Sequence, residues 1–159
     1  NSLTMREIER KYLVNDDAFI AQAHTSTRIA QGYLCARKVT ARIRIYGDVG
    51  YLTFKGKSHD GGLSRFEFER QIPLRCAEQL LRRCGGIVEK IRHLVEHKGY
   101  TWEVDEFKGD NEGLVVAEVE LPDTKCTPPL PEWIWKEVTS DYHYRNSYLA
   151  QKPYREWFK

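Results

Sequence analysis

The sequence lacks any long hydrophobic run. No stretch approaches the roughly 20 apolar residues that a membrane-spanning helix needs. No signal-peptide pattern precedes Met5 either. We therefore expect a cytoplasmic protein with no membrane partner. Residues 1–4 are interpreted as a cloning remnant before a native start at Met5, which leaves residues 5–159 as one domain of ordinary size.

The cysteines and histidines lack the spacings of a thiol or imidazole metal site. The chain has 4 cysteines and 5 histidines, but no Cys-x-x-Cys pair and no shared histidine interval. Cys76 and Cys84 fall in one predicted helix, where eight residues span roughly 12 Å. That separation is too large for a disulfide bridge. Reduced thiols are therefore predicted, in agreement with a cytoplasmic location.

An excess of one charge sign is also missing. The chain has 25 Lys and Arg residues against 23 Asp and Glu residues, and its net charge is only +2. This balance does not indicate a nucleic-acid partner, which normally requires a strongly basic surface. Charged residues nevertheless make up 30% of the sequence. This fraction is slightly above the globular average, so the surplus charge needs a location in the fold.

Alternating polar and apolar residues dominate what is present, and this pattern is typical of β-strands. Glycine-containing turns separate several strands by few residues, which favours antiparallel hairpins. The predicted strands are 5–14, 29–36, 39–46, 50–56, 64–72, 87–97, 100–107 and 114–121. Helices are predicted at 16–23, 74–86 and 132–138, and from Asn146 to the end. The predicted fold class is mainly β (α+β): a closed, eight-stranded antiparallel barrel with a few helices outside.

One face of nearly every predicted strand is charged. Neighbouring residues of a strand point to opposite sides, so Glu7, Glu9 and Lys11 share a face that opposes Ile8 and Tyr12. The same alternation recurs in six further strands. The charged faces contribute the acids Glu7, Glu9, Glu67, Glu69, Glu103, Asp105, Glu118 and Glu120 and the bases Lys11, Arg42, Arg44, Lys55, Arg65, Lys90 and Arg92.

A solvent-exposed sheet face is the simplest interpretation of any single strand. The complete set favours a site, because strands usually disfavour Glu and a wet face mixes in Ser and Thr. Paired carboxylates suit Mg²⁺, and paired guanidinium groups suit phosphate oxygens. If the charged faces turn inward, the apolar core lies outside the barrel wall. A barrel of about eight strands then has room for side chains or one small ligand.

These motifs resemble the CYTH superfamily, also called triphosphate tunnel metalloenzymes. Glu7-Ile8-Glu9-Arg10-Lys11 matches the E-x-E-x-K signature of that family. Further matches follow in the family's order at 42–44, Lys55, 64–69, 89–92, 104–107 and 118–120, and the segment 137–150 resembles the family's closing segment. The short bacterial inorganic tripolyphosphatases are the most similar members.

The resemblance implies a tunnel in which Mg²⁺ or Mn²⁺, two ions per site, supports hydrolysis of a triphosphate. Tripolyphosphate would be cleaved to diphosphate and phosphate. The implied metal ligands are Glu7, Glu9, Glu67, Glu69, Glu118 and Glu120. The implied substrate-binding residues are Lys11, Arg42, Arg44, Lys55, Arg65, Lys90, Arg92 and Asp105. The implied catalytic residues are Lys11, Tyr33, Glu67, Glu69 and Tyr144.

Several alternatives stay open at this stage. The same tunnel could serve an adenylate cyclase, a thiamine triphosphatase or a nucleoside triphosphatase, and no segment of the sequence clearly predicts a base pocket. A non-catalytic polyphosphate-binding module is a further alternative, although every acidic motif position is filled. The aromatic tail with Tyr154, Trp157 and Phe158 has three candidate roles: capping the barrel, plugging a tunnel mouth or joining a homodimer.

Overall fold

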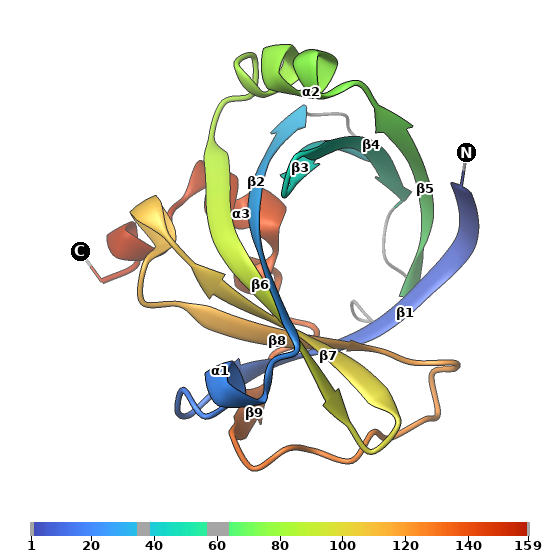
Figure 1. The fold of residues 1–159 in the computed structure, drawn as a ribbon, viewed down its shortest axis with the longest axis vertical. Coiled ribbons are helices and arrows are strands. Elements are labelled where there is room, and N and C mark those ends of the chain that lie inside the picture. Colours follow the sequence, from blue (N-terminus) through green and yellow to red (C-terminus); the bar gives the residue numbers. More distant parts are fainter. Residues whose placement is uncertain (1, 35–38, 57–63, 159) are drawn as a thin grey trace.

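A computed structural model describes residues 2–34, 39–56 and 64–158; the side chains of residues 2–7, 39 and 64–66 are outside this description. Strands dominate it (Figure 1). They are β1 (Ser2–Val14), β2 (Thr25–Leu34), β3 (Val39–Tyr46), β4 (Val49–Gly56), β5 (Ser64–Ile72), β6 (Ile87–His97), β7 (Tyr100–Phe107), β8 (Val115–Glu120) and β9 (Ile134–Glu137). The α-helices are α1 (Phe19–Gln22), α2 (Leu74–Leu81) and α3 (Asn146–Gln151), and short 3-10 turns lie at Gly109–Asn111, Tyr142–Tyr144 and Tyr154–Glu156.

Eight of the strands pair in a ring around a tunnel. The order of neighbours is β5-β4-β3-β2-β6-β7-β8-β1, and β1 also pairs with β5. Every pairing is antiparallel, as the predicted hairpins require. Figure 1 looks into this ring, with β1 and β5 on its right side. The predicted eight-stranded barrel is therefore confirmed.

A tight turn joins β6 to β7. Lys98 and Gly99 have φ values of 49° and 86°, so both central residues adopt the left-handed conformation. Two such residues form the hairpin turn whose twist matches that of the flanking strands. This turn fixes the register that pairs Arg92 with Asp105. The two side chains consequently lie next to each other on the inner face.

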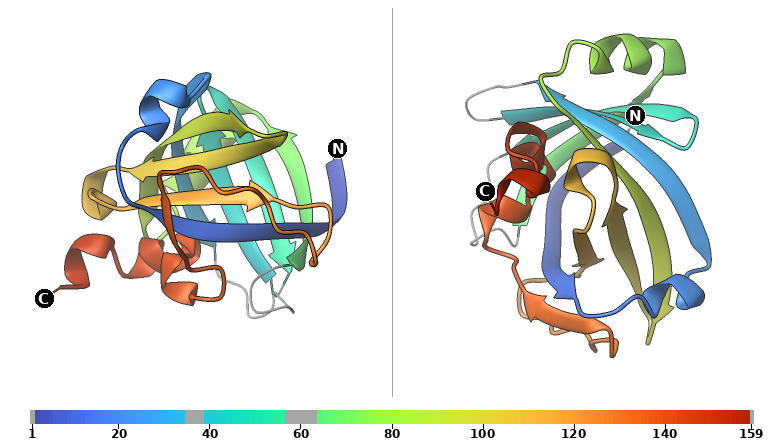
Figure 2. Two further views of the ribbon diagram at one scale, coloured as in Figure 1. Left: turned by 90° about the horizontal axis from the view of Figure 1, so that it is seen from below. Right: turned by 90° about the vertical axis from the view of Figure 1, so that its left-hand side faces the viewer.

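The apolar core lies on the outside of the barrel, in three clusters. The first contains Trp102 and Trp133 and is completed by Phe19 of α1. The second packs Phe107 against Leu149 of α3. In the third, α2 covers the outer faces of β3 and β4 (Figure 2). The strands therefore use their apolar sides to hold the helices, which leaves their charged sides for the tunnel.

Two of the helix predictions need correction. The predicted helix at 132–138 is wrong, because Ile134–Glu137 forms β9 and pairs with β1. Trp133 and Ile134 are buried in the outer core, and isoleucine and tryptophan also favour strands over helices. The terminal helix ends earlier than predicted, at Gln151, two residues before Pro153. Proline disfavours the helical conformation in the residue before it.

Within the described ranges, Cys76, Cys84 and Cys126 are free thiols, whereas Cys35 is outside the described residues. No helix in these ranges combines the length and the hydrophobicity needed to cross a membrane.

Candidate active site

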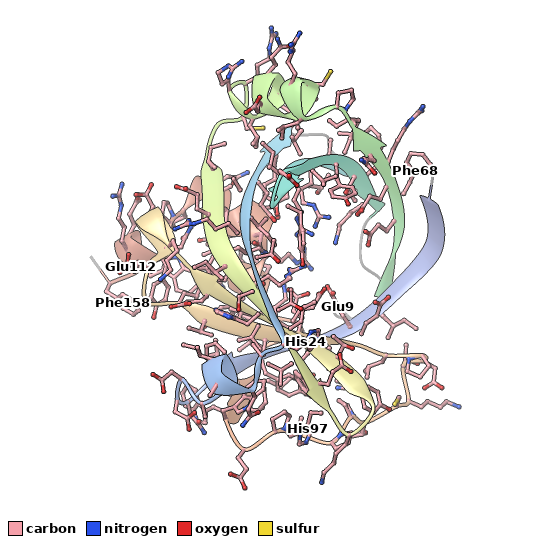
Figure 3. The ribbon with its side chains drawn as sticks, in the orientation of Figure 1. Glu9, His24, Phe68, His97, Glu112 and Phe158 are labelled. Carbon is pink, nitrogen blue, oxygen red and sulfur yellow. The ribbon has the colours of Figure 1, made fainter. Side chains whose placement is uncertain are left out.

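The charged strand faces meet in the tunnel and line a cavity of about 370 Å³. Figure 3 shows side chains from several strands projecting into the ring, with the labelled Glu9 on its inner side. The cavity brings together most residues that the sequence predicted for the site. They are Glu9, Lys11, Tyr33, Arg42, Arg44, Lys55, Glu67, Glu69, Lys90, Arg92, Glu118 and Glu120.

Asp105 and Tyr144 lie away from the cavity lining, and two other predicted site residues have no described side chain. Asp105 lies behind the cavity wall, where it is 1% exposed and contacts two lining bases. Tyr144 lies in the outer cluster around Leu149, with its ring 5.3 Å from that of Trp157. The side chains of Glu7 and Arg65 are outside the described residues, although the backbones of the two residues pair across β1 and β5.

One wall of the cavity carries closely opposed carboxylates. Glu9 faces Glu120 across β1 and β8, and Glu103 faces Glu118 across β7 and β8. Like charges directly opposite each other destabilise a sheet, so this wall favours a bound cation. Carboxylate oxygens are also the donors that hard divalent cations prefer. The donor set therefore fits such a cation, although no three acidic, His or Cys side chains of the described ranges converge on one point.

Lys11 and Glu118 join this acidic wall to the bases. Lys11 Nζ lies 3.7 Å from Glu118 Oε1. Burial alone would raise the pKa of Glu118. Lys11, a hydrogen bond with Glu9 and the charges of Arg92 and Lys90 outweigh that effect and hold the pKa well below its usual range. Glu118 is thus ionised at neutral pH, as a metal ligand must be.

A second wall, built by β3, β4 and β5, adjoins the acidic wall where β5 pairs with β1, and it combines bases with two further carboxylates. Arg42 NH2 lies 3.7 Å from Glu69 Oε2 and 3.2 Å from Thr53 Oγ1. Lys55 Nζ lies 3.7 Å from Glu67 Oε2. These ion pairs are longer than the 2.7–2.9 Å of a tight charge-assisted hydrogen bond. A stronger acceptor, such as a phosphoryl oxygen, can therefore replace the carboxylate in these two ion pairs.

A tighter network lies beneath the β6 and β7 wall. Asp105 accepts hydrogen bonds from Lys90 Nζ at 2.7 Å and from Arg92 Nε and NH2 at 2.8 and 2.9 Å. Asn146 Oδ1 accepts a further bond from Lys90 Nζ at 2.9 Å. This network fixes both bases at the cavity surface. Asp105 is therefore placed as a residue that orients Lys90 and Arg92.

Burial shifts the pKa values of Asp105 and Lys90 in this network and of Arg44 nearby. It would raise the pKa of Asp105, but Arg92 and Lys90 outweigh it and lower that pKa to about 2. Burial lowers the pKa of Lys90 to about 7, against the opposing charge of Asp105. It also lowers the pKa of Arg44 to about 9, assisted by Arg42 and Arg92. Burial therefore disfavours the positive charges of Lys90 and Arg44, and a bound anion would stabilise them.

Some lining residues were not predicted from the sequence. They are Gln31, Thr40, Tyr46, Tyr51, Arg145, Asn146 and Ser147. Glu103, which the strand pattern placed on a charged face without a specific role, also lines the cavity. The uncharged members carry no signal in a count of charged strand faces. Strand alternation does place Gln31 on the side of Tyr33, and it places Tyr51 on the side of Lys55. Asn146 had no comparable signal, since it comes from α3 and reaches the tunnel through the tertiary fold.

Known proteins show the same combination of sequence and fold. An inorganic triphosphatase of Acetivibrio thermocellus is 43% identical over 155 residues, which cover 96% of this chain and 97% of that protein. An inorganic triphosphatase of Nitrosomonas europaea is 35% identical, with coverage of 92% and 97%. A solved structure of an inorganic triphosphatase superposes with a TM-score of 0.66 at 31% identity, covering 91% of this chain and 97% of that one.

More distant structures share only the fold. A putative adenylyl cyclase from Hippeastrum has a TM-score of 0.60 at 18% identity, and the match covers 74% of this chain and 80% of that one.

The profile of the CYTH domain matches residues 5–153, nearly the full length of the sequence. The resemblance drawn from the ordered strand motifs is thereby confirmed, and the chain belongs to the CYTH domain family.

Proposed function

We propose that this protein is an inorganic triphosphatase that hydrolyses tripolyphosphate to diphosphate and phosphate with the help of a divalent cation. One observation carries the proposal: a single cavity of about 370 Å³ is lined by opposed carboxylates and by bases from β1, β3, β4 and β6. Related proteins that are 43% and 35% identical over nearly the whole chain carry the name inorganic triphosphatase, which supports the same conclusion.

The bases bind and orient the substrate. Arg42, Arg44 and Lys55 extend from the β3 and β4 side of the cavity, while Lys90 and Arg92 extend from β6. Bases on two sides can hold the phosphate chain in one orientation and neutralise its oxygens. Phosphoryl transfer depends mainly on such positioning and on electrostatic stabilisation. Lys11 adds a further positive charge beside the acidic wall.

Carboxylates divide between two tasks. Glu9, Glu118 and Glu120, together with Glu7, would hold Mg²⁺ or Mn²⁺, which neutralises charge on the phosphoryl oxygens when it is bound. Glu67 and Glu69 lie on β5, which neighbours β1 in the ring. They would accept hydrogen bonds from the attacking water or contribute to a second cation site.

A substrate panel tests this proposal. Tripolyphosphate, ATP and thiamine triphosphate are each offered with Mg²⁺ or Mn²⁺ between pH 7 and 9.5, and phosphate and diphosphate release are measured. We expect the highest kcat/KM with tripolyphosphate. Release of cyclic AMP and diphosphate from ATP would instead identify a cyclase, and tight binding of tripolyphosphate without turnover would identify a binding module.

A further inference from the structure

Gln31 is an uncharged residue within the charged tunnel wall. It lies on β2, lines the cavity and is 0% exposed. Both ends of its amide are engaged by other lining residues. Arg44 Nε donates to Gln31 Oε1 at 2.9 Å, and Gln31 Nε2 donates to the hydroxyl of Tyr33 at 2.5 Å. Gln31 therefore links a base to a phenol within the proposed site.

The donors and acceptors available fix the direction of the hydrogen bonds that link Arg44, Gln31 and Tyr33. A guanidinium group only donates, so Arg44 requires the carbonyl oxygen of Gln31 as its acceptor. The amide nitrogen must then face Tyr33, and it can only donate. The hydroxyl oxygen of Tyr33 is consequently an acceptor toward Gln31, and its own proton points elsewhere. Burial lowers the pKa of Arg44 only to about 9, so the guanidinium keeps its donor role at neutral pH.

Tyr33 can donate that proton in a hydrogen bond to a substrate bound in the cavity. It lines the same cavity and pairs with Arg42 across β2 and β3. Phosphoryl oxygens are strong hydrogen-bond acceptors, and Arg42 would draw them toward this part of the wall. We propose that Gln31 is a positioning residue that sets Tyr33 as a hydrogen-bond donor to a phosphoryl oxygen of the bound substrate. This inference rests on the proposed triphosphatase function.

Two substitutions at Gln31 separate the effect of its hydrogen-bond direction from the effect of its side-chain shape. Gln31→Met keeps a similar volume but removes both hydrogen bonds. Gln31→Glu keeps an acceptor for Arg44 but replaces the donor to Tyr33 with a second acceptor, which turns the phenol proton away from the cavity. Gln79→Glu makes the same chemical change at an exposed position of α2 and serves as the control.

Kinetics give the first readout. We expect kcat for tripolyphosphate to fall about 10-fold or more in Gln31→Met, Gln31→Glu and Tyr33→Phe. Tyr33→Phe removes the hydrogen bond to charged substrate, and the two Gln31 variants no longer orient the phenol proton toward it. Combining Tyr33→Phe with Gln31→Met should then cost no more than about 2-fold beyond Tyr33→Phe alone, because the two residues act as a unit. Losses that multiply fully would show that Gln31 does not act through Tyr33.

A substrate-free titration gives the second readout. The protein is labelled with 3-fluorotyrosine, and the ¹⁹F resonance of Tyr33 is assigned by its loss in Tyr33→Phe. We expect Gln31→Glu to raise the pKa of this phenol relative to the parent, because the phenolate loses its donor and faces a carboxylate. Gln79→Glu should leave it unchanged. An unchanged pKa in Gln31→Glu would overturn the proposal.

The two readouts also separate this inference from the triphosphatase proposal. A parent protein that hydrolyses no tripolyphosphate would contradict the proposed function and, with it, the donation of the Tyr33 proton to substrate. The titration would still report whether Gln31 sets the direction of that proton. A shifted pKa together with non-multiplying kcat losses supports the inference in full.

Discussion

In the part of the chain that the structure describes, Asp105 is the only carboxylate that accepts hydrogen bonds from both Lys90 and Arg92. Asp105→Asn removes this carboxylate. Asp105 is 1% exposed, and its three hydrogen bonds to the two bases measure 2.7 to 2.9 Å. Removing one partner of a buried ion pair typically costs about 3–5 kcal/mol, because the remaining charge stays buried without compensation. For a chain of this length, we expect the melting temperature to fall on the order of 10 °C.

The size of this loss should depend on pH in a defined direction. The pKa of Lys90 in the fold is about 7, below its ordinary value of 10.5. Lys90 is therefore a buried cation below pH 7 and loses that charge as the pH rises through 7. Part of the penalty of Asp105→Asn disappears with it. We expect the destabilisation to be larger at pH 6 than at pH 9.

Acid supplies a second signature of the same network. The pKa of Asp105 is about 2 in the fold, against an ordinary value of 3.8. Its stabilising contribution is complete above about pH 4 and is lost as the pH falls toward 2. Asp105→Asn should therefore remove part of the acid sensitivity of the parent. Urea unfolding followed by circular dichroism at pH 3, 6 and 9 measures the free energy of unfolding of parent and variant. It therefore reports the loss of stability in Asp105→Asn, the smaller loss at pH 9 than at pH 6, and the reduced acid sensitivity.

Asp48→Asn is the matched control, since Asp48 is exposed in the turn between β3 and β4. We expect it to change the free energy of unfolding by less than about 0.5 kcal/mol. A loss of less than about 1 kcal/mol in Asp105→Asn at pH 6 would refute the reasoning, because a buried pair of cations would then be stable without its counter-ion.

Three further perturbations test other parts of the structure. Arg42→Ala should reduce kcat/KM for tripolyphosphate by about 10²–10³ while the exposed Arg82→Ala does not, and equal rates in a coupled phosphate assay would exclude Arg42 from substrate binding. Glu120→Gln should raise the Mg²⁺ concentration for half-maximal activity about 10-fold or more, and an unchanged Mg²⁺ titration would exclude Glu120 as a ligand. Gly86→Ala should destabilise the protein by about 1–3 kcal/mol, because a Cβ at Gly86 would clash with the carbonyl oxygen of Ala150. Gly85→Ala is the control, since a Cβ at Gly85 would meet open space. Equal melting temperatures of the Gly86→Ala and Gly85→Ala variants would contradict the close approach of Gly86 to Ala150.

Strand alternation carried most of what the sequence could predict. Charges at every second residue placed Glu9, Lys11, Arg42 and Glu118 on inner faces, and the structure brings all four to one cavity. The pattern succeeds because the period of a strand is two, so one local sequence decides which face each side chain occupies. The same reasoning placed the apolar residues outside the ring, where Trp102 is 0% exposed.

Features that depend on tertiary contacts were harder to predict. Residues 132–138 were predicted as a helix, but the segment is too short for periodicity to decide, and pairing with β1 makes Ile134–Glu137 a strand. Asn146 reaches Lys90 only because α3 packs against the barrel. The depth of Asp105 behind the wall also follows from the hydrogen bonds it accepts. Alternation gives the side of the sheet and contains no information about depth.

The proposed function is tested most directly by following tripolyphosphate with ³¹P NMR in the presence of Mg²⁺ and catalytic amounts of the protein. We expect the terminal and central phosphorus signals to decay together while phosphate and diphosphate appear in equal amounts. Removal of the cation with EDTA should stop the reaction, and added Mg²⁺ should restore it. A tripolyphosphate spectrum that stays unchanged with both Mg²⁺ and Mn²⁺ would contradict the assignment of this tunnel as a triphosphatase site.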